Sequence, residues 1–262
     1  MQDGNFSVDG LRGVSGLGFS QFAADVMARV AAGDGTPRAA LKEPVLAAML
    51  AAARSPDPRA LDRLRPDFRR LRISNEQLAD HYIPELARRL GREWEDDRST
   101  FSQVSIGSAR LQALLRDVGK GWSADATGAT GAATVLLIVP GNEQHTLGAL
   151  VVAGWLRRKG ISVCLRFAPT AAELAAILAE RRFDGAMISV ACHEMLEICS
   201  GLVKTLRQET SNGLRIALGG AILEQSEDFA VVSQVDIVTN DLSKAVDVLG
   251  LTCRRPAMTV IT

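Results

Sequence analysis

The chain is organised around one segment, VLLIVPGNEQHTLGA, at residues 135–149. Its first five residues are continuously apolar, which is typical of a strand buried on both faces of a parallel sheet. A proline and a glycine end the strand, a short polar loop follows, and helical spacing begins at Thr146. The loop is therefore expected at the carboxyl end of a strand, where open α/β sheets bind their ligands. His145 lies in this loop, and a histidine in that position is a candidate metal ligand.

The second half of the chain alternates strands with helices. Strands are expected at residues 134–139, 161–165, 186–190, 214–218 and 236–238. Helices are expected to begin near Thr146, Thr170, Glu194, Ala221 and Leu242. Five strands joined by crossover helices predict an α/β fold, with a five-stranded parallel sheet of the flavodoxin or Rossmann-like kind.

The first half of the chain has the spacing of a helical bundle. The expected divisions are a flexible, glycine-rich tail at residues 1–18, a helical cap domain at 19–118, a linker at 119–131 and the sheet domain at 132–262. Ser74 and Gln77 form a capping-box pattern at the start of one helix, and Ser99 is expected to cap the next. Trp122, inside the linker, is expected to pack on one of the two domains.

The composition favours an ordinary cytoplasmic protein. Thirty basic residues balance thirty acidic ones, so charge alone predicts neither direct DNA binding nor attraction to an anionic membrane. No segment is long and apolar enough to span a bilayer, and no signal segment is apparent. Four cysteines show no CxxC pairing, and we expect them to be small buried residues in a reducing compartment.

Three short motifs fall at the ends of predicted strands. In chain order they are Glu143-x-His145-x-x-Gly148, Ser189-x-Ala191 and Gly219-Gly220. The set resembles the cobalamin-binding pattern DxHxxG, SxL and GG, and the intervals of 40 and 27 residues between the motifs are close to the family spacing. By this resemblance, residues 132–262 are identified as a cobalamin-binding domain.

The resemblance implies a role for each motif. In the family, a histidine replaces the cofactor's own dimethylbenzimidazole as the lower cobalt ligand, and the displaced nucleotide tail enters a slot between strands. His145 would be the cobalt ligand, a role that suits imidazole, and Glu143 would hydrogen-bond its ring. Ser189 would hydrogen-bond the tail, and the two glycines would leave room for it. The expected cofactor-binding residues are Glu143, Gln144, His145, Thr146, Gly148, Ser189, Val190, His193, Gly219, Gly220 and, from the cap, Trp94.

Two positions depart from the family pattern. Glu143 replaces an aspartate and is one methylene longer, so its contact with the histidine would need a different rotamer. Ala191 replaces a leucine, and His193 replaces the polar residue four after the serine, so the slot is expected to be looser or differently bonded.

The cap adds a second resemblance. The segment YIPELARRLGREW, at residues 82–94, resembles the helical cap over the upper face of cobalamin in methionine synthase and in light-sensing cobalamin regulators. Trp94 would then be a lid above the cofactor. The regulators' Glu-His pair, which supplies an upper ligand, is replaced here by Val104 and Ser105.

Together the two halves resemble the AerR/PpaA group of cobalamin-binding antirepressors of photosynthesis genes. The resemblance implies bound adenosyl-, methyl- or hydroxocobalamin, whose cobalt would respond to light or redox state. It also implies a redox-responsive repressor of the PpsR/CrtJ type as partner. No membrane is expected as a partner. The sequence shows no nucleophile-base pair and no phosphate loop, so no enzymatic activity is expected.

Three alternatives are compatible with the same residues. The first is a corrinoid methyl carrier of a methyltransferase system, which would use the same two domains. The second is a haem-binding sensor of the same fold, for which the serine and Gly-Gly motifs would not be required. The third is an interaction module that binds no cofactor.

Overall fold

The computed structural model describes residues 41–122, 132–141, 146–190, 193–220, 222–225 and 234–251. The predicted tail at residues 1–18 and the first part of the predicted cap domain, residues 19–40, lie outside these ranges. In the first half the elements are α2 (Glu43–Arg54), η1 (Asp62–Leu64), α3 (Arg65–Arg70), α4 (Asn75–Gln77), η2 (Leu78–Tyr82), α5 (Ile83–Glu95), α6 (Phe101–Val118) and η3 (Gly119–Trp122). In the second half they are β1 (Thr134–Val139), α7 (Thr146–Arg158), β2 (Ser162–Phe167), α8 (Ala171–Glu180), β3 (Gly185–Ser189), η4 (His193–Met195), α9 (Leu196–Glu209), β4 (Ile216–Gly219), α10 (Ile222–Gln225), β5 (Ile237–Val238) and α11 (Leu242–Leu249).

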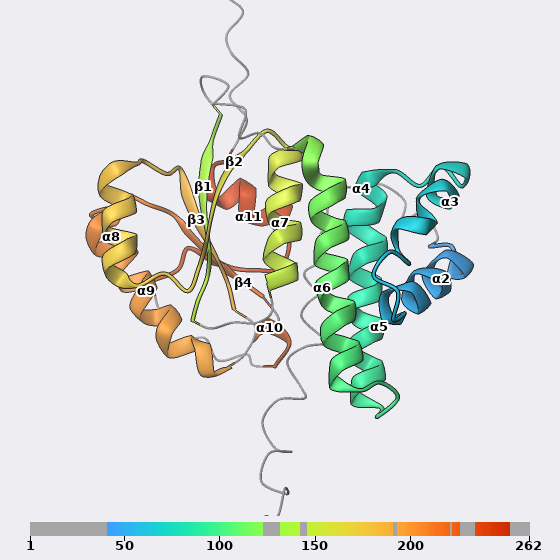
Figure 1. The fold of residues 1–262 in the computed structure, drawn as a ribbon. Coiled ribbons are helices and arrows are strands. Elements are labelled where there is room, and N and C mark those ends of the chain that lie inside the picture. Colours follow the sequence, from blue (N-terminus) through green and yellow to red (C-terminus); the bar gives the residue numbers. More distant parts are fainter. Residues whose placement is uncertain are drawn as a thin grey trace, which may run out of the picture.

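The five strands form one parallel sheet in the order β2-β1-β3-β4-β5. This is the flavodoxin-like order, and it confirms the predicted fold class. Helices α7 and α11 cover one face of the sheet, and α8 and α9 cover the other (Figure 1). Because all strands are parallel, their carboxyl ends meet at one edge, where β1 leads toward α7.

The helices of the first half pack beside α7 rather than directly on the sheet. In Figure 1, α6 lies next to α7, and α5, α2 and α3 follow farther from the sheet. The predicted capping box is confirmed, since the Ser74 hydroxyl accepts from Gln77 N–H and the Gln77 side chain accepts from Ser74 N–H. The prediction that Ser99 caps α6 is wrong. Thr100 takes that role with Gln103, and the Ser99 hydroxyl donates to the Glu93 carboxylate instead.

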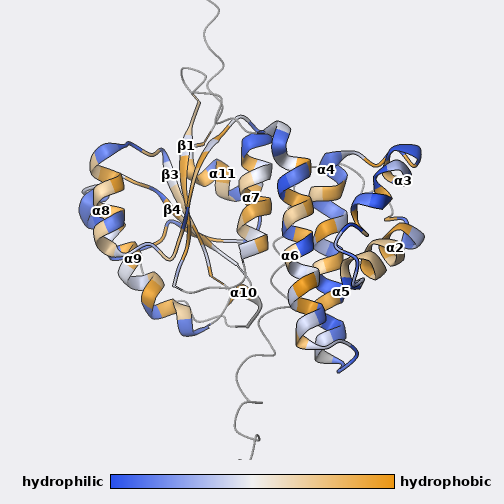
Figure 2. Cartoon of the chain, in the orientation of Figure 1, coloured by the Kyte–Doolittle hydropathy of each residue, from blue (hydrophilic) through white to orange (hydrophobic). Residues whose placement is uncertain are grey.

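Apolar residues of the strands point alternately to the two faces of the sheet. Figure 2 shows the strands as largely hydrophobic, whereas α3 is largely hydrophilic. Cys164 and Cys199 are buried and free, as predicted, while Cys192 and Cys253 lie outside the described residues. In the described part of the chain, no helix combines the length and apolarity that crossing a membrane requires.

The connection between the two halves begins as helix. The first four residues of the predicted linker form η3, and residues 123–131 lie outside the described ranges. Trp122, at the end of η3, is half-buried against α7, where the Arg158 guanidinium lies 4.2 Å from the centre of its ring. The prediction that this tryptophan packs on a neighbouring domain is confirmed.

Candidate functional site

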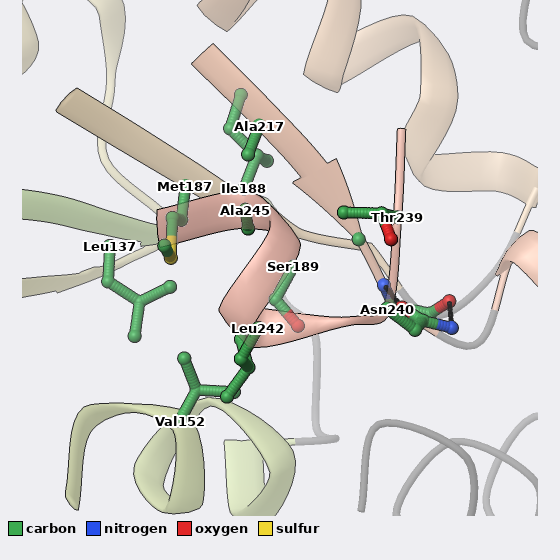
Figure 3. A pocket seen from close by; sticks show the side chains of 12 residues that line it. Leu137, Val152, Met187, Ile188, Ser189, Ala217, Thr239, Asn240, Leu242 and Ala245 are labelled. Atoms are coloured by element: carbon green, nitrogen blue, oxygen red, sulfur yellow. Dashed lines mark hydrogen bonds between the residues drawn. The ribbon is translucent and has the colours of Figure 1, made fainter. Parts of the chain in front are cut away.

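A hollow opens at the carboxyl edge of the sheet, between the strand ends and helices α7 and α11 (Figure 3). Its empty space, with the open mouth included, is about 380 Å³. The walls are mostly apolar and comprise Leu137, Val152, Met187, Ile188, Ser189, Ala217, Gly219, Gly220, Thr239, Asn240, Leu242 and Ala245. None of these side chains titrates near neutral pH, so the hollow suits a group whose buried part is uncharged.

Ser189 is the hydroxyl that β3 brings to this hollow. The residue ends the strand and is 9% exposed. Its side chain points toward Leu242 across the hollow in Figure 3. No group among the described residues hydrogen-bonds this hydroxyl. Within the described part of the chain this hydroxyl is left for another partner, and its predicted hydrogen bond to a cofactor tail stays a prediction.

Gly219 and Gly220 lie where the ends of three strands approach one another closely. A Cβ on Gly220, whose φ is 122°, would lie 2.1 Å from the carbonyl oxygen of Val190. A Cβ on Gly219 would lie 2.8 Å from the carbonyl oxygen of Thr239. The glycines thus have a structural reason, the close approach of backbone, in addition to the predicted one of leaving room for a cofactor tail.

Asn240 fixes this glycine turn from the end of β5. Its side-chain oxygen accepts from Gly220 N–H at 2.7 Å, and its amide nitrogen donates to the Gly220 carbonyl at 3.2 Å. The side chain is buried, with 3% exposed. Sequence reasoning missed both Thr239 and Asn240 as wall residues. The available signal was two polar residues directly after the fifth predicted strand, at the same edge as Ser189.

The predicted cobalt-ligand loop connects β1 with α7. Glu143, Gln144 and His145 lie outside the described residues, so their roles stay predictions. The residues on each side of the loop are described. Gly141 has φ of 58°, and a Cβ there would approach the sulfur of Met195 to 2.7 Å, while Thr146 begins α7. These flanks place both ends of the loop at the edge where the hollow opens.

The remaining predicted site residues lie at different places in the fold. The Thr146 hydroxyl accepts a hydrogen bond of 3.1 Å from the Gln112 side chain of α6, and Gly148 is buried within α7. Val190 is buried at the edge, where its N–H donates to the Gly219 carbonyl at 2.9 Å. His193 is exposed on η4. None of these four predicted residues is among the walls of the hollow.

Trp94, the predicted lid, lies near the end of α5. It is half-buried, and its ring packs edge-on against Phe101 with 6.1 Å between the ring centres. Phe101 is 69% exposed. Figure 1 shows the turn between α5 and α6 projecting beyond the carboxyl edge of the sheet. The half-buried Trp94 and the exposed Phe101 thus leave apolar surface uncovered at this end of the cap, and the lid role of Trp94 stays a prediction.

Comparison with known proteins indicates which cofactor this site binds. The chain matches the B12 binding domain family over residues 133–249. It is also 46% identical to an uncharacterized 20.5 kDa protein in the bchF-crtJ intergenic region of Rhodobacter capsulatus. That similarity extends over 191 residues, which are 73% of this chain and 100% of the relative. The chain belongs to the same family as this relative, and its residues 133–249 form a B12 binding domain.

The fold of this B12-binding protein is similar to that of the monomethylamine corrinoid protein of Methanosarcina barkeri. The TM-score is 0.59 with 13% sequence identity, over 76% of this chain and 94% of the other. At this identity the likeness supports the fold alone.

The residues of the hollow fit the cofactor of the family. Its apolar walls suit the buried part of a nucleotide tail, and the Ser189 hydroxyl, which has no hydrogen-bond partner among the described residues, is a donor that such a tail could use. The predictions of family, fold class and cofactor are thereby confirmed, and the family match favours cobalamin over the haem alternative.

Proposed function

We propose that this B12-binding protein is an antirepressor of photosynthesis gene expression, responsive to light or redox state. The observation that carries the proposal is its 46% identity to a protein whose gene lies beside crtJ. The partner in this proposal is a redox-responsive repressor of the PpsR/CrtJ type, the class that the AerR/PpaA resemblance implies.

Cofactor binding in this proposal follows the family pattern. His145 would be the residue that holds cobalt from below, and Glu143 would orient its ring through a hydrogen bond. The hollow holds the displaced tail, with Ser189 as its hydrogen-bond partner. Trp94 and Phe101 cover the upper face from the cap.

The signal in this proposal is a repacking of the cap. When bound, an alkylcobalamin supplies a cobalt–carbon bond that light breaks. Trp94 and Phe101 would face a different surface once that bond is broken, and the α5–α6 turn would then take a second position. The repressor then distinguishes these two positions of the cap surface.

The experiment compares binding of the repressor to protein loaded with adenosylcobalamin, kept dark or illuminated. We expect the affinity for the repressor to change at least tenfold on illumination. We expect His145→Ala to weaken cobalamin binding at least tenfold and to abolish the light response. Equal repressor affinity of the apo, dark and illuminated forms would overturn the proposal.

A corrinoid methyl carrier is the second candidate, favoured by the fold shared with the monomethylamine corrinoid protein. It requires that the cobalt of this protein exchange methyl groups with a methyltransferase. Incubation with methyl donors and measurement of methylcobalamin turnover separates this candidate from the regulator, for which no turnover is expected.

A further inference from the structure

Helix α7 is held to the helical half of the molecule at both of its ends. At its first residue, Thr146, the hydroxyl accepts from the Gln112 side chain of α6 at 3.1 Å. At its last residue, Arg158, the guanidinium pairs with Asp80 of η2 and lies over the Trp122 ring at 4.2 Å from its centre. These two attachments are 12 positions apart in the helix.

The attachment at Arg158 is suited to fixing geometry. The side chains of Arg158 and Asp80 are only 14% and 17% exposed. Burial raises the pKa of the Asp80 carboxyl and outweighs the opposing attraction of Arg158. An ion pair of this kind adds little net stability, but it strongly disfavours arrangements that leave either charge buried alone. The end of α7 therefore has one preferred position against the cap.

The attachment at Thr146 lies beside the predicted cobalt ligand. Thr146 directly follows His145 in the chain, so the position of its backbone limits where the His145 side chain can reach. Gln112 comes from the cap and not from the sheet domain. Leu147 and Ala149 are buried in the same turn, so core packing fixes most of its position, and the Gln112 hydrogen bond is the polar contact that ties its first residue to the cap.

We infer that Gln112 is a positioning residue, which holds the first turn of α7 so that His145 meets cobalt from a position defined by the cap. The inference rests on the proposed role of His145 as the cobalt ligand. It makes the cap part of the lower-ligand site as well as the cover of the upper face.

The first experiment uses the apo-protein, and hydrogen exchange is measured for Gln112→Ala. We expect the amides in the first turn of α7 to exchange about fivefold faster, since one neutral hydrogen bond is lost, and the amides near Arg158 to be unchanged. Arg116→Ala is the matched control, because Arg116 is exposed on the same helix. Equal exchange in the two variants would overturn the inference.

The second experiment loads the variants with cobalamin and records affinity and absorption spectrum. For Gln112→Ala we expect severalfold weaker binding and a larger fraction of the spectrum in which cobalt keeps its own base. Thr146→Val should have the same effect and add little to Gln112→Ala, whereas Thr146→Ser, which keeps the hydroxyl, should restore the wild-type spectrum. Additive effects of Gln112→Ala and Thr146→Val would overturn the inference.

His145→Ala distinguishes failure of the inference from failure of the proposed ligand. An unchanged spectrum in His145→Ala would overturn the role of His145 and, with it, the inference. A changed spectrum in His145→Ala beside a wild-type spectrum in Gln112→Ala would overturn the inference alone.

Discussion

The two faces of the sheet pack against different kinds of neighbour. On one face, Val135, Leu137 and Val139 of β1 belong to a hydrophobic cluster that continues through α7 into the helical cap. On the other face, Leu136 and Ile138 belong to a separate cluster with α8 and α9. Most apolar walls of the hollow come from the first cluster. Ligand binding and cap packing therefore share one core, whereas the second face supports the sheet.

The largest effects are expected from identical substitutions in two adjacent residues of β1, one facing each side of the sheet. Leu136→Ala and Leu137→Ala each truncate a side chain that is no more than 1% exposed, so each is expected to cost about 2–5 kcal/mol of unfolding free energy. Only Leu137→Ala enlarges the hollow, so only this variant should change cobalamin affinity. Denaturant unfolding and cobalamin titration measure the two effects, and an equal loss of affinity in both variants would contradict the division of roles.

Two glycine-to-alanine substitutions, one at the hollow and one in α9 on the second face, are expected to change stability in opposite directions. Gly220→Ala places a Cβ against the Val190 backbone at a positive φ, and we expect it to cost about 2–3 kcal/mol and to weaken cobalamin binding. Gly201→Ala, in α9 on the second face, meets open space and should stabilise the protein by about 0.5–1 kcal/mol through helix propensity. Thermal unfolding checks both signs. Unchanged stability in Gly220→Ala would show that the backbone is not constrained there.

Two aspartates, one paired with α7 of the first face and one with α9 of the second, are expected to give opposite pH dependences of stability. Burial raises the pKa of Asp80 above its ordinary value of 3.8, so its contribution is present below that value and is lost as the pH rises through the higher native pKa. Burial alone would also raise the pKa of Asp236, but Ile216 N–H and the Arg207 guanidinium lower it. The contribution of Asp236 is therefore present above 3.8 and is lost as the pH falls through its lower native pKa.

Asp80→Asn and Asp236→Asn test these signs through unfolding free energies measured from pH 2 to pH 7. Relative to each variant, the wild type should lose stability with rising pH in the first case and with falling pH in the second. The same sign in both cases would contradict the different electrostatic settings of the two faces.

The smallest expected effect is on the reactivity of the Cys199 thiol, which is buried in α9 on the second face. Burial raises the pKa of Cys199 to about 12, so this thiol should not react with alkylating reagents at pH 8 in the folded protein. Mass spectrometry of each cysteine before and after denaturation measures the reaction. Rapid labelling of native Cys199 would show that the α9 face opens easily.

Much of the sheet domain was predictable because its signals are local. The continuous apolar run of β1 predicted both the strand and its bounds, and the three strand-end motifs predicted the edge that carries the hollow. The weaker predictions concern positions whose neighbours are distant in the chain. Asn240 closes the glycine turn from 20 residues away, and nothing near Gly220 in the sequence shows that contact.

The cap contacts were not predictable for the same reason. Gln112 is 34 residues from Thr146, and Asp80 is 78 residues from Arg158. Sequence periodicity identifies which face of a helix is apolar, but it does not show which polar side chains meet across two halves of a molecule. The Ser99 prediction failed on a smaller scale, since Thr100 has the better partner in Gln103 one helical turn later.

Electron paramagnetic resonance of the cob(II)alamin-loaded protein tests whether His145 is the lower ligand of bound cobalamin. The protein is prepared once with ordinary histidine and once with ¹⁵N-labelled histidine, while the cofactor stays unlabelled. We expect the nitrogen splitting of the cobalt lines to change from three components to two on labelling, because the coordinating nitrogen comes from the protein. A three-component splitting in both samples, with the cofactor's own base on cobalt, would contradict the account.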